Sequence, residues 1–337
     1  MKTASAQATV EAPRHWTDAE VAEHLTLAET VEAVRQALVD AHRGRIEQPQ
    51  RLALGDGRLL VMAARASGAV GDAVVKTVNV SAHAGEVAEG VHGIVLSLDG
   101  ETGRVTTAEA STLTVLRTAA LVALATEVLA PPRVHTLAVL GAGRQARGQV
   151  AAVALVRRPS TVRIWNRTRE RAAAFAEELA ATMPEVRVEV ADTADQAVGG
   201  ADVVCCATAS TDALFDASAL SPQAHVNAIG AYRPDMHEIP QEAMAVADLV
   251  VADDVAACLV ESGEIIDAVV SGAVDASRLR SLGEVLIDPP TRRGVTVFKS
   301  VGIAAADYAA ARLLHRPRGG GHDIPSAINS PDRPAGA

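Results

Sequence analysis

A glycine-rich turn in the middle of the chain has the residue spacing of a nucleotide-binding motif. The apolar run Thr136–Leu140 is followed by Gly141-Ala142-Gly143-Arg144-Gln145-Ala146, and a helix-compatible segment covers 147–156. Gly141 would allow a sharp exit from a strand, Gly143 would let the backbone approach a pyrophosphate, and small Ala146 would let the helix pack closely. The first amides of that helix would face the phosphates. Such turns also serve packing alone, but this context predicts a dinucleotide bound by residues 141–145.

The residues after the next expected strand, 161–165, favour a 2′-phosphate on that dinucleotide. A Rossmann turn is usually followed here by an acidic residue that binds the ribose 2′-hydroxyl. This chain has Asn166, Arg167 and Thr168 instead, with no carboxylate. Arg167 would supply positive charge to a phosphate, and Asn166 and Thr168 would supply hydrogen bonds. Thr168 could also be only the N-cap of a helix at 169–179. Together with the glycine turn, these three residues predict NADP(H) rather than NAD(H).

Two further strand ends would border the nicotinamide half of the cofactor. Ligands of doubly wound sheets bind at the carboxyl ends of the strands. The expected strands at 202–207 and 225–230 both end at that edge. The candidate cofactor contacts there are Thr208, Ser210, Ala228 and Gly230.

Three basic residues in the first part of the chain lie in apolar surroundings rather than in charged runs. Lys76 lies in Ala73-Val-Val-Lys-Thr-Val-Asn-Val80, where strand alternation would place it on one face with the valines two positions away. A lysine among valines is costly unless it is paired or takes part in chemistry. Arg117 lies near the start of an apolar helix, and Arg51 lies where a strand begins. Each alone is more often structural, with its head group reaching the surface, but the three together predict an anion pocket.

The elements that must position these residues follow from the order of apolar runs. Hydrophobic residues make up 49% of the chain and aromatic residues 2%, which is typical of an α/β protein with Val-rich strands and Ala-rich helices. Short strands with tight turns predict a largely antiparallel or mixed sheet first, followed by a helix at 112–129. Strands and helices then alternate, which predicts a doubly wound parallel Rossmann sheet. The expected strands are 58–64, 73–80, 93–99 and 104–110, and then 136–140, 161–165, 186–190, 202–207, 225–230, 248–252 and 294–300.

Pro131 and Pro132 mark the expected domain boundary. Residues 1–130 would form a smaller α+β substrate-binding domain, and residues 131–300 the Rossmann domain. A helix at 301–315 is expected to pack back on the first domain. Residues 1–15 are expected to be frayed, and the glycine- and proline-rich tail at 316–337 to be disordered.

Composition excludes several classes of protein. The net charge of −10 argues against non-specific nucleic-acid binding, which needs a basic surface. The three cysteines have no framework spacing and are expected to be buried, reduced thiols, and we expect no metal site. The N-terminus lacks the apolar core of a signal peptide, and the longest apolar stretch near a helix, 118–130, is too short to span a bilayer. We therefore expect a soluble, cytoplasmic protein.

Five segments, in order along the chain, resemble the ornithine cyclodeaminase/mu-crystallin family. They are Lys76 in its strand, Thr114-x-x-Arg117-Thr-Ala-Ala, the glycine turn, Val226-Asn-Ala-Ile-Gly-Ala231 and Val301-Gly-Ile-Ala-x-x-Asp307. The resemblance covers roughly residues 17–315. Within the family, residues 164–168, Arg233-Pro-Asp235 with Glu238, and 296–300 look most similar to the mu-crystallin branch of NADPH-binding ketimine reductases. The resemblance implies a homodimer whose first domains join their sheets across the two-fold axis, with a substrate cleft between the domains.

The resemblance also implies roles for particular residues. Arg51 and Arg117 would hold the substrate carboxylate, and Lys76 would sit beside the reacting carbon. His92 matches a family position near substrate and cofactor, although by itself it would be an ordinary sheet histidine. Glu261 matches a pocket position of the mu-crystallin branch, and its alternative is a solvated carboxylate at a helix end.

One departure from the family pattern bears on the activity. Cyclodeaminases, and some alanine dehydrogenases of the family, carry an Asp two residues after the Gly of the Asn-Ala-x-Gly segment, where it activates the attacking amine or water. Here Gly230 and Ala231 are followed by Tyr232. A phenol with a pKa of about 10 is a poor base at neutral pH, although it can donate a proton or a hydrogen bond. Tyr232 therefore argues against ornithine cyclisation.

The expected activity is NADPH-dependent reduction of a C=N bond next to a carboxylate, as in a ketimine or a cyclic imino acid. Hydride would pass from the nicotinamide to the imine carbon and give an L-amino acid. The alternatives are an amino-acid dehydrogenase or reductive aminase of a 2-keto acid, a cyclodeaminase, and a protein that binds NADPH and an amino-acid-like ligand without turnover.

Overall fold

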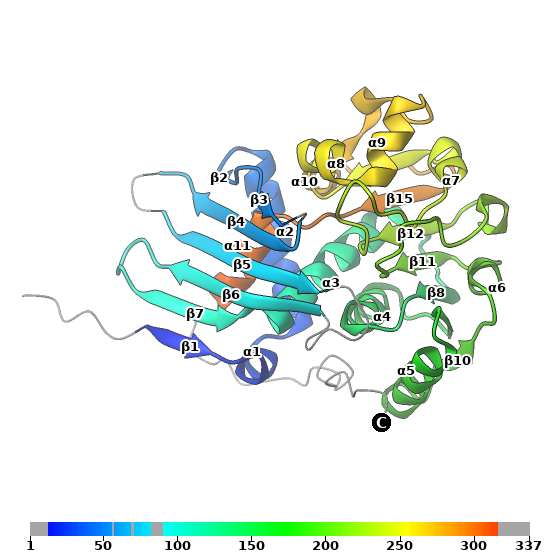
Figure 1. Ribbon diagram of the computed structural model, residues 1–337, viewed down its shortest axis with the longest axis horizontal. Helices are drawn as coiled ribbons and strands as arrows, with labels where there is room; N and C mark the ends of the chain where they lie inside the picture. The colour runs from blue at the N-terminus through cyan, green and yellow to red at the C-terminus, as the bar shows by residue number, and fades with distance from the viewer. Residues whose placement is uncertain (1–12, 56, 69–70, 82–89, 316–337) are drawn as a thin grey trace, which may run out of the picture.

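The fold consists of two β-sheets with one long helix between them. The computed structural model describes residues 13–55, 57–68, 71–81 and 90–315, so the expected tail and most of the expected frayed N-terminus lie outside the described residues. One sheet is built from residues 14–109 and the other from residues 136–299. Helix α3 (Ala110–Leu129) contacts strands of both sheets (Figure 1).

The first sheet is mixed, as the run of short strands predicts. Its order is β1-β7-β6-β5-β4-β2, with β3 paired to β4 off this path. Neighbouring strands are antiparallel except β1 and β7, which are parallel. The strands are β1 (Arg14–Trp16), β2 (Ile46–Glu47), β3 (Leu52–Leu54), β4 (Leu59–Ala66), β5 (Ala73–Ser81), β6 (Gly90–Leu98) and β7 (Val105–Glu109).

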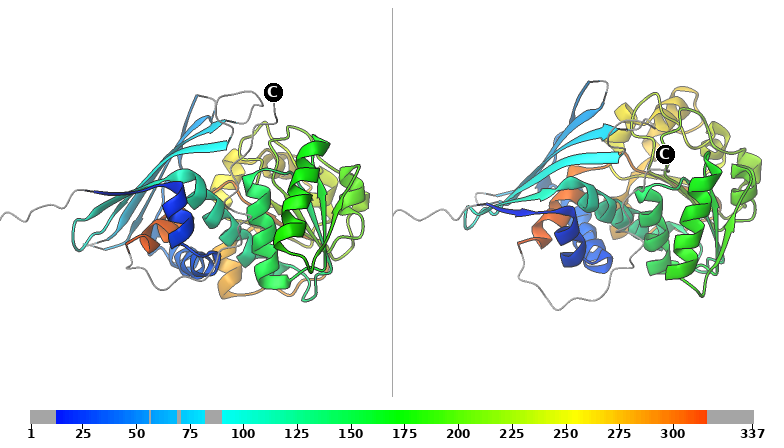
Figure 2. Two further views of the ribbon diagram at one scale, coloured as in Figure 1. Left: turned by 90° about the horizontal axis from the view of Figure 1, so that it is seen from below. Right: turned by 60° about the horizontal axis from the view of Figure 1, so that its bottom comes forward.

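Helices lie on one face of this sheet, and the opposite face points away from the rest of the molecule (Figure 2). They are α1 (Asp18–His24), α2 (Leu27–His42), α3 and α11 (Ala304–Leu313). Reciprocal capping boxes start α1 and α2, because Thr17 and Thr26 each exchange hydrogen bonds with the glutamate three residues later. Helix α11 packs on α2, α3 and the central strands of the first sheet. The end of the described chain therefore returns to the first sheet, as expected from the sequence.

Helix α3 is apolar around its whole circumference because it is enclosed on all sides. Among the described residues it is the one helix that is long and apolar enough to cross a membrane, by length and composition alone. However, 89% of its most apolar window is buried inside the fold, which is the pattern of a core helix. One face of α3 packs against the second sheet, and it carries Arg117 into the interior.

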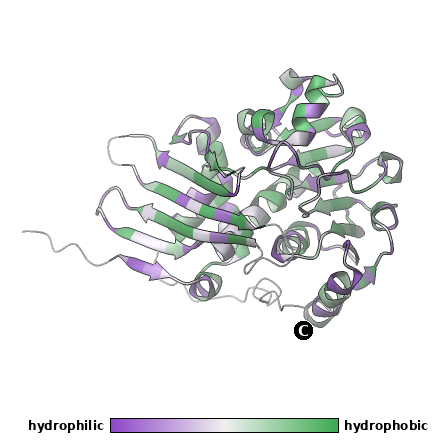
Figure 3. Ribbon diagram, viewed as in Figure 1, coloured by the Kyte–Doolittle hydropathy of each residue, from purple (hydrophilic) through white to green (hydrophobic). Residues whose placement is uncertain are grey.

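The second sheet is entirely parallel, which confirms the predicted Rossmann arrangement. Its order is β10-β9-β8-β11-β12-β15-β13-β14. Apolar residues dominate the strands of both sheets (Figure 3). The strands are β8 (Thr136–Leu140), β9 (Thr161–Trp165), β10 (Arg187–Val190), β11 (Val203–Cys206), β12 (His225–Ala228), β13 (Leu249–Ala252), β14 (Arg280–Ser281) and β15 (Thr296–Lys299).

Helices cover both faces of the second sheet. They are α4 (Arg144–Arg157), α5 (Arg169–Thr182), α6 (Ala194–Val198), α7 (Gln241–Val246), α8 (Val255–Glu261), α9 (Gly263–Val270) and α10 (Leu282–Ile287), with 3₁₀ turns at Ala217–Ala219 and Ala276–Arg278. The last strand, β15, lies between β12 and β13, so the chain leaves the sheet from the middle of its carboxyl edge. This exit directs residues 300–303 toward the first sheet and α11.

The structure corrects the expectations at the N-terminus. Residues 13–15 were expected to be frayed, but Arg14–Trp16 forms β1 beside β7. Trp16 anchors this strand because its ring is buried and the Arg14 guanidinium stacks 3.6 Å above it. The two-residue β14 was also not expected, since so short a strand has no alternation to detect.

Candidate functional site

Lys76 is buried at the centre of the first sheet. Val74, Lys76 and Val78 are buried on the same face of β5, as the alternation predicts. The Nζ of Lys76 donates a hydrogen bond of 2.7 Å to Oδ1 of Asp307 on α11. Burial, together with the charge of Arg117, lowers the pKa of Lys76 to about 7, although Asp307 acts in the opposite direction. Lys76 can therefore exchange a proton near neutral pH.

Arg117 shares the carboxylate of Asp307 with Lys76. Its Nε lies 3.1 Å from Oδ1 of Asp307, and its side chain is 8% exposed. The backbone at Gly302 lies against the guanidinium, because a Cβ there would be 3.0 Å from both terminal nitrogens. Gly302 also has a φ of +89°, a conformation that favours glycine. Strand β5, helix α3 and the segment leading into α11 thus meet in one buried charged cluster.

Asp253 holds the turn that brings Gly302 to Arg117. This buried carboxylate follows β13 at the carboxyl edge of the second sheet. Its Oδ2 accepts hydrogen bonds from the Ser300 hydroxyl at 2.6 Å and from the Gly302 amide at 2.8 Å. The second sheet therefore positions one wall of the cluster that the first sheet contains.

Arg51 lies where three separate parts of the chain converge. Its Nη1 donates to the carbonyl of Val301 at 2.7 Å, and its Nη2 donates to the carbonyl of Tyr232 at 3.0 Å. The same Nη2 is 2.7 Å from Oε2 of Glu261, at the end of α8. The fold therefore gathers Arg51, Tyr232 and Glu261, three of the residues predicted to bind substrate.

Tyr232 and Glu261 both lie in surroundings that disfavour their charged forms. Burial raises the pKa of Tyr232, against the opposing charges of Arg233 and Arg51. Burial also raises the pKa of Glu261, against the opposing charge of Arg51. The centroid of the Tyr232 ring is 5.9 Å from the guanidinium carbons of both Arg51 and Arg233. Tyr232 therefore keeps its proton at neutral pH and is a hydrogen-bond donor rather than a base.

Free space lies on both sides of the ion pair between Arg51 and Glu261. Both spaces are open to solvent on one side. The first is bordered by Gln48, Gln50, Met62, Asp254, Gly302 and Ile303. The second is bordered by Ala53, Gly57, Leu60, Tyr232, Arg233 and Asp235. Arg51 and Glu261 line both, so a small anion in either cavity would meet a buried guanidinium.

The structure does not bring His92 to Lys76. The register of β5 and β6 pairs His92 with Asn79, and Lys76 with Val95. His92 therefore shares the exposed, outer face of β6 with Ile94, whereas Lys76 faces the helices. His92 was predicted to lie near substrate and cofactor, and within one copy of the chain the sheet separates it from Lys76.

The glycine turn has the geometry that a dinucleotide requires. Gly141 has a φ of +118°, and a Cβ there would be 2.5 Å from the carbonyl oxygen of Ala207. Gly143 is the N-cap of α4. Among the described residues, no side chain caps this helix start, and no atom would lie within 4 Å of a Cβ at Gly143. Uncapped amides beside open space favour a phosphate group. The residues at 141–143 therefore fit a pyrophosphate.

Two side chains of this turn differ in their contacts. The Arg144 guanidinium donates to the hydroxyls of Ser111 and Thr112, the latter at 3.0 Å, and so ties α4 to the start of α3. Gln145 has a buried Oε1 that has no hydrogen-bond partner among the described residues. Arg144 was predicted to bind the cofactor, and in this structure its two terminal nitrogens donate to α3.

Asn166, Arg167 and Thr168 follow β9 at the carboxyl edge of the sheet, as expected. Asn166 donates to the carbonyl of Thr168 at 2.9 Å and so shapes the turn. Thr168 is the N-cap of α5, but its side chain makes no capping hydrogen bond. Arg167 is exposed, and no described residue pairs with it. A guanidinium and a hydroxyl therefore remain available at this strand end.

Thr208 and Gly230 meet at the carboxyl ends of β11 and β12. A Cβ at Gly230 would lie 2.0 Å from the carbonyl oxygen of Thr208, so the two loops are in direct contact. The Thr208 hydroxyl donates to Glu238 at 2.8 Å, and the Ser210 hydroxyl donates to the carbonyl of Asp212 at 2.7 Å. Thr208 and Ser210 were predicted to contact the cofactor, and in this structure their hydroxyls stabilise the loops that follow β11 and β12.

Ala228 is the last residue of β12 and is buried beneath this loop contact. Its carbonyl accepts a hydrogen bond of 3.0 Å from the Ser300 amide. Ala228 was also predicted to contact the cofactor, and its side chain is enclosed by the core of the second sheet. A contact from Ala228 would therefore use backbone rather than side chain.

Three buried carboxylates of the site were not singled out as site residues from the sequence. Asp307 had a usable signal, because it is an acidic residue inside the apolar, alanine-rich segment 304–311. Asp253 had none, since Ala252-Asp-Asp-Val255 reads as an ordinary turn and helix start. Glu238 was quoted only as part of a family pattern, because no local spacing shows that its side chain turns back to the amides of Gly230 and Ala231 and reaches Thr208.

Comparison with known proteins gives a consistent result. The sequence profile of the ornithine cyclodeaminase/mu-crystallin family matches residues 14–318. A Delta(1)-pyrroline-2-carboxylate reductase of Bacillus cereus is 36% identical over 231 residues, which cover 67% of this chain and 70% of that protein. The ketimine reductase mu-crystallin of Mus musculus is 39% identical over 209 residues, covering 61% and 63% of the two chains.

A solved structure shows the same fold. The Thermococcus litoralis Delta(1)-pyrroline-2-carboxylate reductase, in complex with NADH and L-proline, superposes with a TM-score of 0.82 over 89% of this chain and 95% of that one. The two sequences are 24% identical, so this likeness establishes the architecture and nothing finer.

Proposed function

The chain belongs to the ornithine cyclodeaminase/mu-crystallin family, and on that basis we propose that it reduces the C=N bond of a carboxylate-bearing cyclic imino acid to an L-amino acid. The observation that carries this proposal is the buried Lys76, which Asp307 holds beside Arg117. Two similar proteins are named for the reduction of such a bond, one as a ketimine reductase and one as a Delta(1)-pyrroline-2-carboxylate reductase.

Each basic residue has a distinct part in this reaction. A bound nicotinamide cofactor supplies the hydride that the imine carbon accepts. Arg51 and Arg117 bind the substrate carboxylate through charge-assisted hydrogen bonds and so fix the position of the neighbouring carbon. Lys76 relays the proton that balances the addition, because a lysine with a pKa of about 7 holds and releases a proton at neutral pH. The substrate nitrogen gains that proton as the carbon gains the hydride.

We infer that the reductant is NADPH. The support is the turn at 166–168, where the exposed Arg167 and the Thr168 hydroxyl stand at the carboxyl end of β9 and no carboxylate is present. A carboxylate there would repel a 2′-phosphate, whereas a guanidinium would attract it.

We also propose that the protein is a homodimer joined through the outer face of the first sheet. That face carries exposed apolar side chains where a solvated sheet would carry polar ones. They are Leu52, Leu54, Leu59, Val75, Ile94, Leu96 and Leu98. A second copy of the same face would cover them by two-fold symmetry.

The direct test is NADPH oxidation with a panel of cyclic imino acids and 2-keto acids, with NADH run in parallel. Reduction of Delta(1)-pyrroline-2-carboxylate without added ammonia supports the proposal. Turnover of 2-keto acids only in the presence of ammonia or an amine would instead indicate reductive amination, which the near-neutral pKa of Lys76 also permits. Tight NADPH binding without any turnover would indicate a ligand-binding protein.

A further inference from the structure

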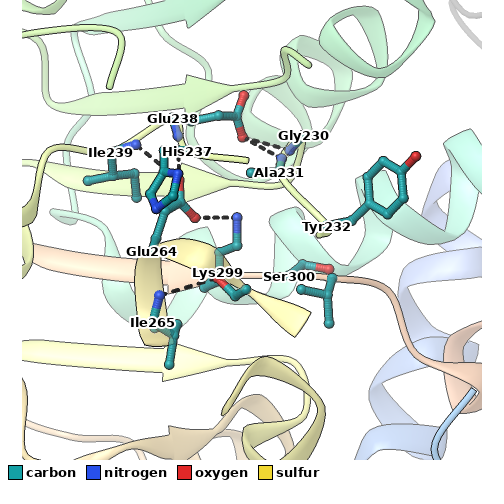
Figure 4. Close-up of polar contacts among 12 residues, drawn as sticks. Gly230, Ala231, Tyr232, His237, Glu238, Ile239, Glu264, Ile265, Lys299 and Ser300 are labelled. Carbon is teal, nitrogen blue, oxygen red and sulfur yellow. Dashed lines mark hydrogen bonds and ion pairs between the residues drawn. The ribbon is translucent and has the colours of Figure 1, made fainter. Parts of the chain in front are cut away.

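The buried carboxylate of Glu238 accepts four hydrogen bonds. Its Oε1 accepts from the Thr208 amide at 2.6 Å and from the Thr208 hydroxyl at 2.8 Å. Its Oε2 accepts from the amides of Gly230 at 2.7 Å and Ala231 at 3.0 Å (Figure 4). The side chain has no exposed surface. We call Glu238 and these three residues the Glu238 clamp.

The Glu238 clamp joins the loop after β11 to the loop after β12. Thr208 and Gly230 each lie two residues after the end of β11 and β12, the strands whose carboxyl ends border the nicotinamide half of a Rossmann site. Ala231 is followed directly by Tyr232, whose carbonyl accepts a hydrogen bond from Arg51. One carboxylate therefore fixes the nicotinamide-side loops and the segment that orients the substrate-side arginine.

The backbone of Glu238 is bound by Glu264, which in turn forms an ion pair with Lys299. Oε1 of Glu264 accepts the amides of Glu238 at 2.6 Å and Ile239 at 3.0 Å. Oε2 of Glu264 pairs with Lys299, and both of these side chains are fully buried (Figure 4). Burial and the charge of Glu264 raise the pKa of Glu238, while Lys299 opposes this. Removing any one partner would leave a buried charged or polar group without compensation, so displacement of these groups is costly.

We propose that Glu238 is a positioning residue of the reaction, which sets the alignment between the nicotinamide side and the substrate side of the site. This inference rests on the proposed reductase function. Hydride transfer is sensitive to such alignment, since a displacement of about 1 Å costs on the order of 10²-fold in rate. The residues that fit the pyrophosphate and the 2′-phosphate lie at 141–143 and 166–168 and are not members of the Glu238 clamp, so we expect the clamp to affect alignment more than cofactor affinity.

The experiment compares wild type with Glu238→Gln and Glu238→Ala, using NADPH and Delta(1)-pyrroline-2-carboxylate. Glu238→Gln keeps the shape but turns an NH₂ group toward backbone donors. We expect kcat/KM to fall on the order of 10²-fold with a raised KM, and the NADPH Kd to change by no more than about twofold. We also expect a larger primary isotope effect with NADPH deuterated at the transferred position, and a changed fluorescence of the bound nicotinamide.

Asp202→Asn is the matched control. Asp202 accepts the amides of His135 at 2.7 Å and Thr136 at 3.0 Å, so it also holds backbone, but at the amino end of the sheet. This variant should keep the wild-type KM and isotope effect. If Glu238→Ala does not fold, Glu238→Gln and Thr208→Val, which removes one donor of the clamp, carry the test.

The outcomes separate the two proposals. A Glu238→Gln protein that only loses active fraction, with unchanged KM, isotope effect and nicotinamide fluorescence, would overturn the positioning role. If wild type reduces no imino acid, the proposed function fails. The fluorescence of NADPH bound to wild type and to Glu238→Gln then still tests whether the clamp orients the nicotinamide.

Discussion

The ammonium nitrogen of Lys76 lies 2.7 Å from the carboxylate of Asp307, and each side chain is only 1% exposed. Either charge alone would be costly at such a depth, and each offsets the desolvation of the other. Arg117 shares the same carboxylate oxygen, so one anion serves two cations. This imbalance keeps the proton on Lys76 weakly held, which is the property that a proton relay needs.

Replacing Lys76 should abolish turnover and leave cofactor binding intact. Lys76→Ala and the better-filled Lys76→Met both remove the proton relay, while the glycine turn and residues 166–168 are untouched. We expect kcat to fall by at least about 10²-fold, with an NADPH Kd close to that of wild type by fluorescence titration. Intact turnover in either variant would remove Lys76 from the chemistry.

The pH profile should report the pKa of Lys76. Lys76 carries its proton below about pH 7 and loses it above. Reduction consumes that proton, so kcat/KM for the imino acid should be flat below about pH 7 and fall above it. Oxidation of the amino acid needs the unprotonated amine and should show the opposite limb. In Lys76→Arg, whose guanidinium stays charged, any residual activity should lack the limb near pH 7.

Asp307→Asn should destabilise the protein and shift the pH at which kcat/KM begins to fall. Two buried cations would lose their shared anion, at a cost of roughly 3–5 kcal/mol in the free energy of unfolding. Asp307 raises the pKa of Lys76, so the falling limb should move to lower pH. The control is Asp267→Asn, which breaks a largely exposed contact with His237 and should cost less than about 1 kcal/mol. Denaturant unfolding and a pH–rate profile measure the two effects.

Arg167→Ala should weaken NADPH and spare NADH. Loss of a charge-assisted contact to a 2′-phosphate should raise the NADPH Kd on the order of tenfold or more. Arg169→Ala is the neighbouring control, because Arg169 is paired with Asp192 and both are exposed. Equal effects of Arg167→Ala on the two cofactors, or none, would argue against the 2′-phosphate assignment.

A charge on the outer face of the first sheet should dissociate the proposed dimer. Leu96 is 39% exposed on that face in the single chain and would be covered by a second copy. Leu96→Asp should give monomers by sedimentation, because an interfacial carboxylate would be buried without a partner. Val270→Asp, at a position 82% exposed on α9, should leave the mass of the assembly unchanged. A monomeric wild type would contradict the proposal directly.

Local features of the sequence were sufficient to predict the type of both sheets and their longer strands, but not the short strands β1, β2, β3 and β14. Strand alternation placed Lys76 on the buried face of β5, and the strands 136–140 and 161–165 have the predicted bounds. The capping boxes at Thr17 and Thr26, and the glycine turn at 141–146, depend on neighbours within a few residues. Such signals are readable because the physics behind them is local.

The sequence could not show which residues form ion pairs or hydrogen bonds with the predicted site residues. Arg51 and Arg117 were expected to await a substrate carboxylate, but Arg51 is already paired with Glu261, and Arg117 with Asp307. Arg144 was predicted to bind the cofactor, and no sequence feature indicated that its guanidinium would also contact α3. These pairings join residues that lie far apart along the chain, and no local pattern encodes them.

The sequence by itself therefore determined which residue types are present, the periodicity that builds each sheet, and the turn that fits a dinucleotide. Only the tertiary structure decided that β15 returns between β12 and β13, which sends Gly302 toward Arg117 and Asp307 toward Lys76. It also placed His92 on the opposite face of the sheet from Lys76. The physical reason is that burial and charge pairing depend on distances in space, which the chain acquires only when separate elements pack together.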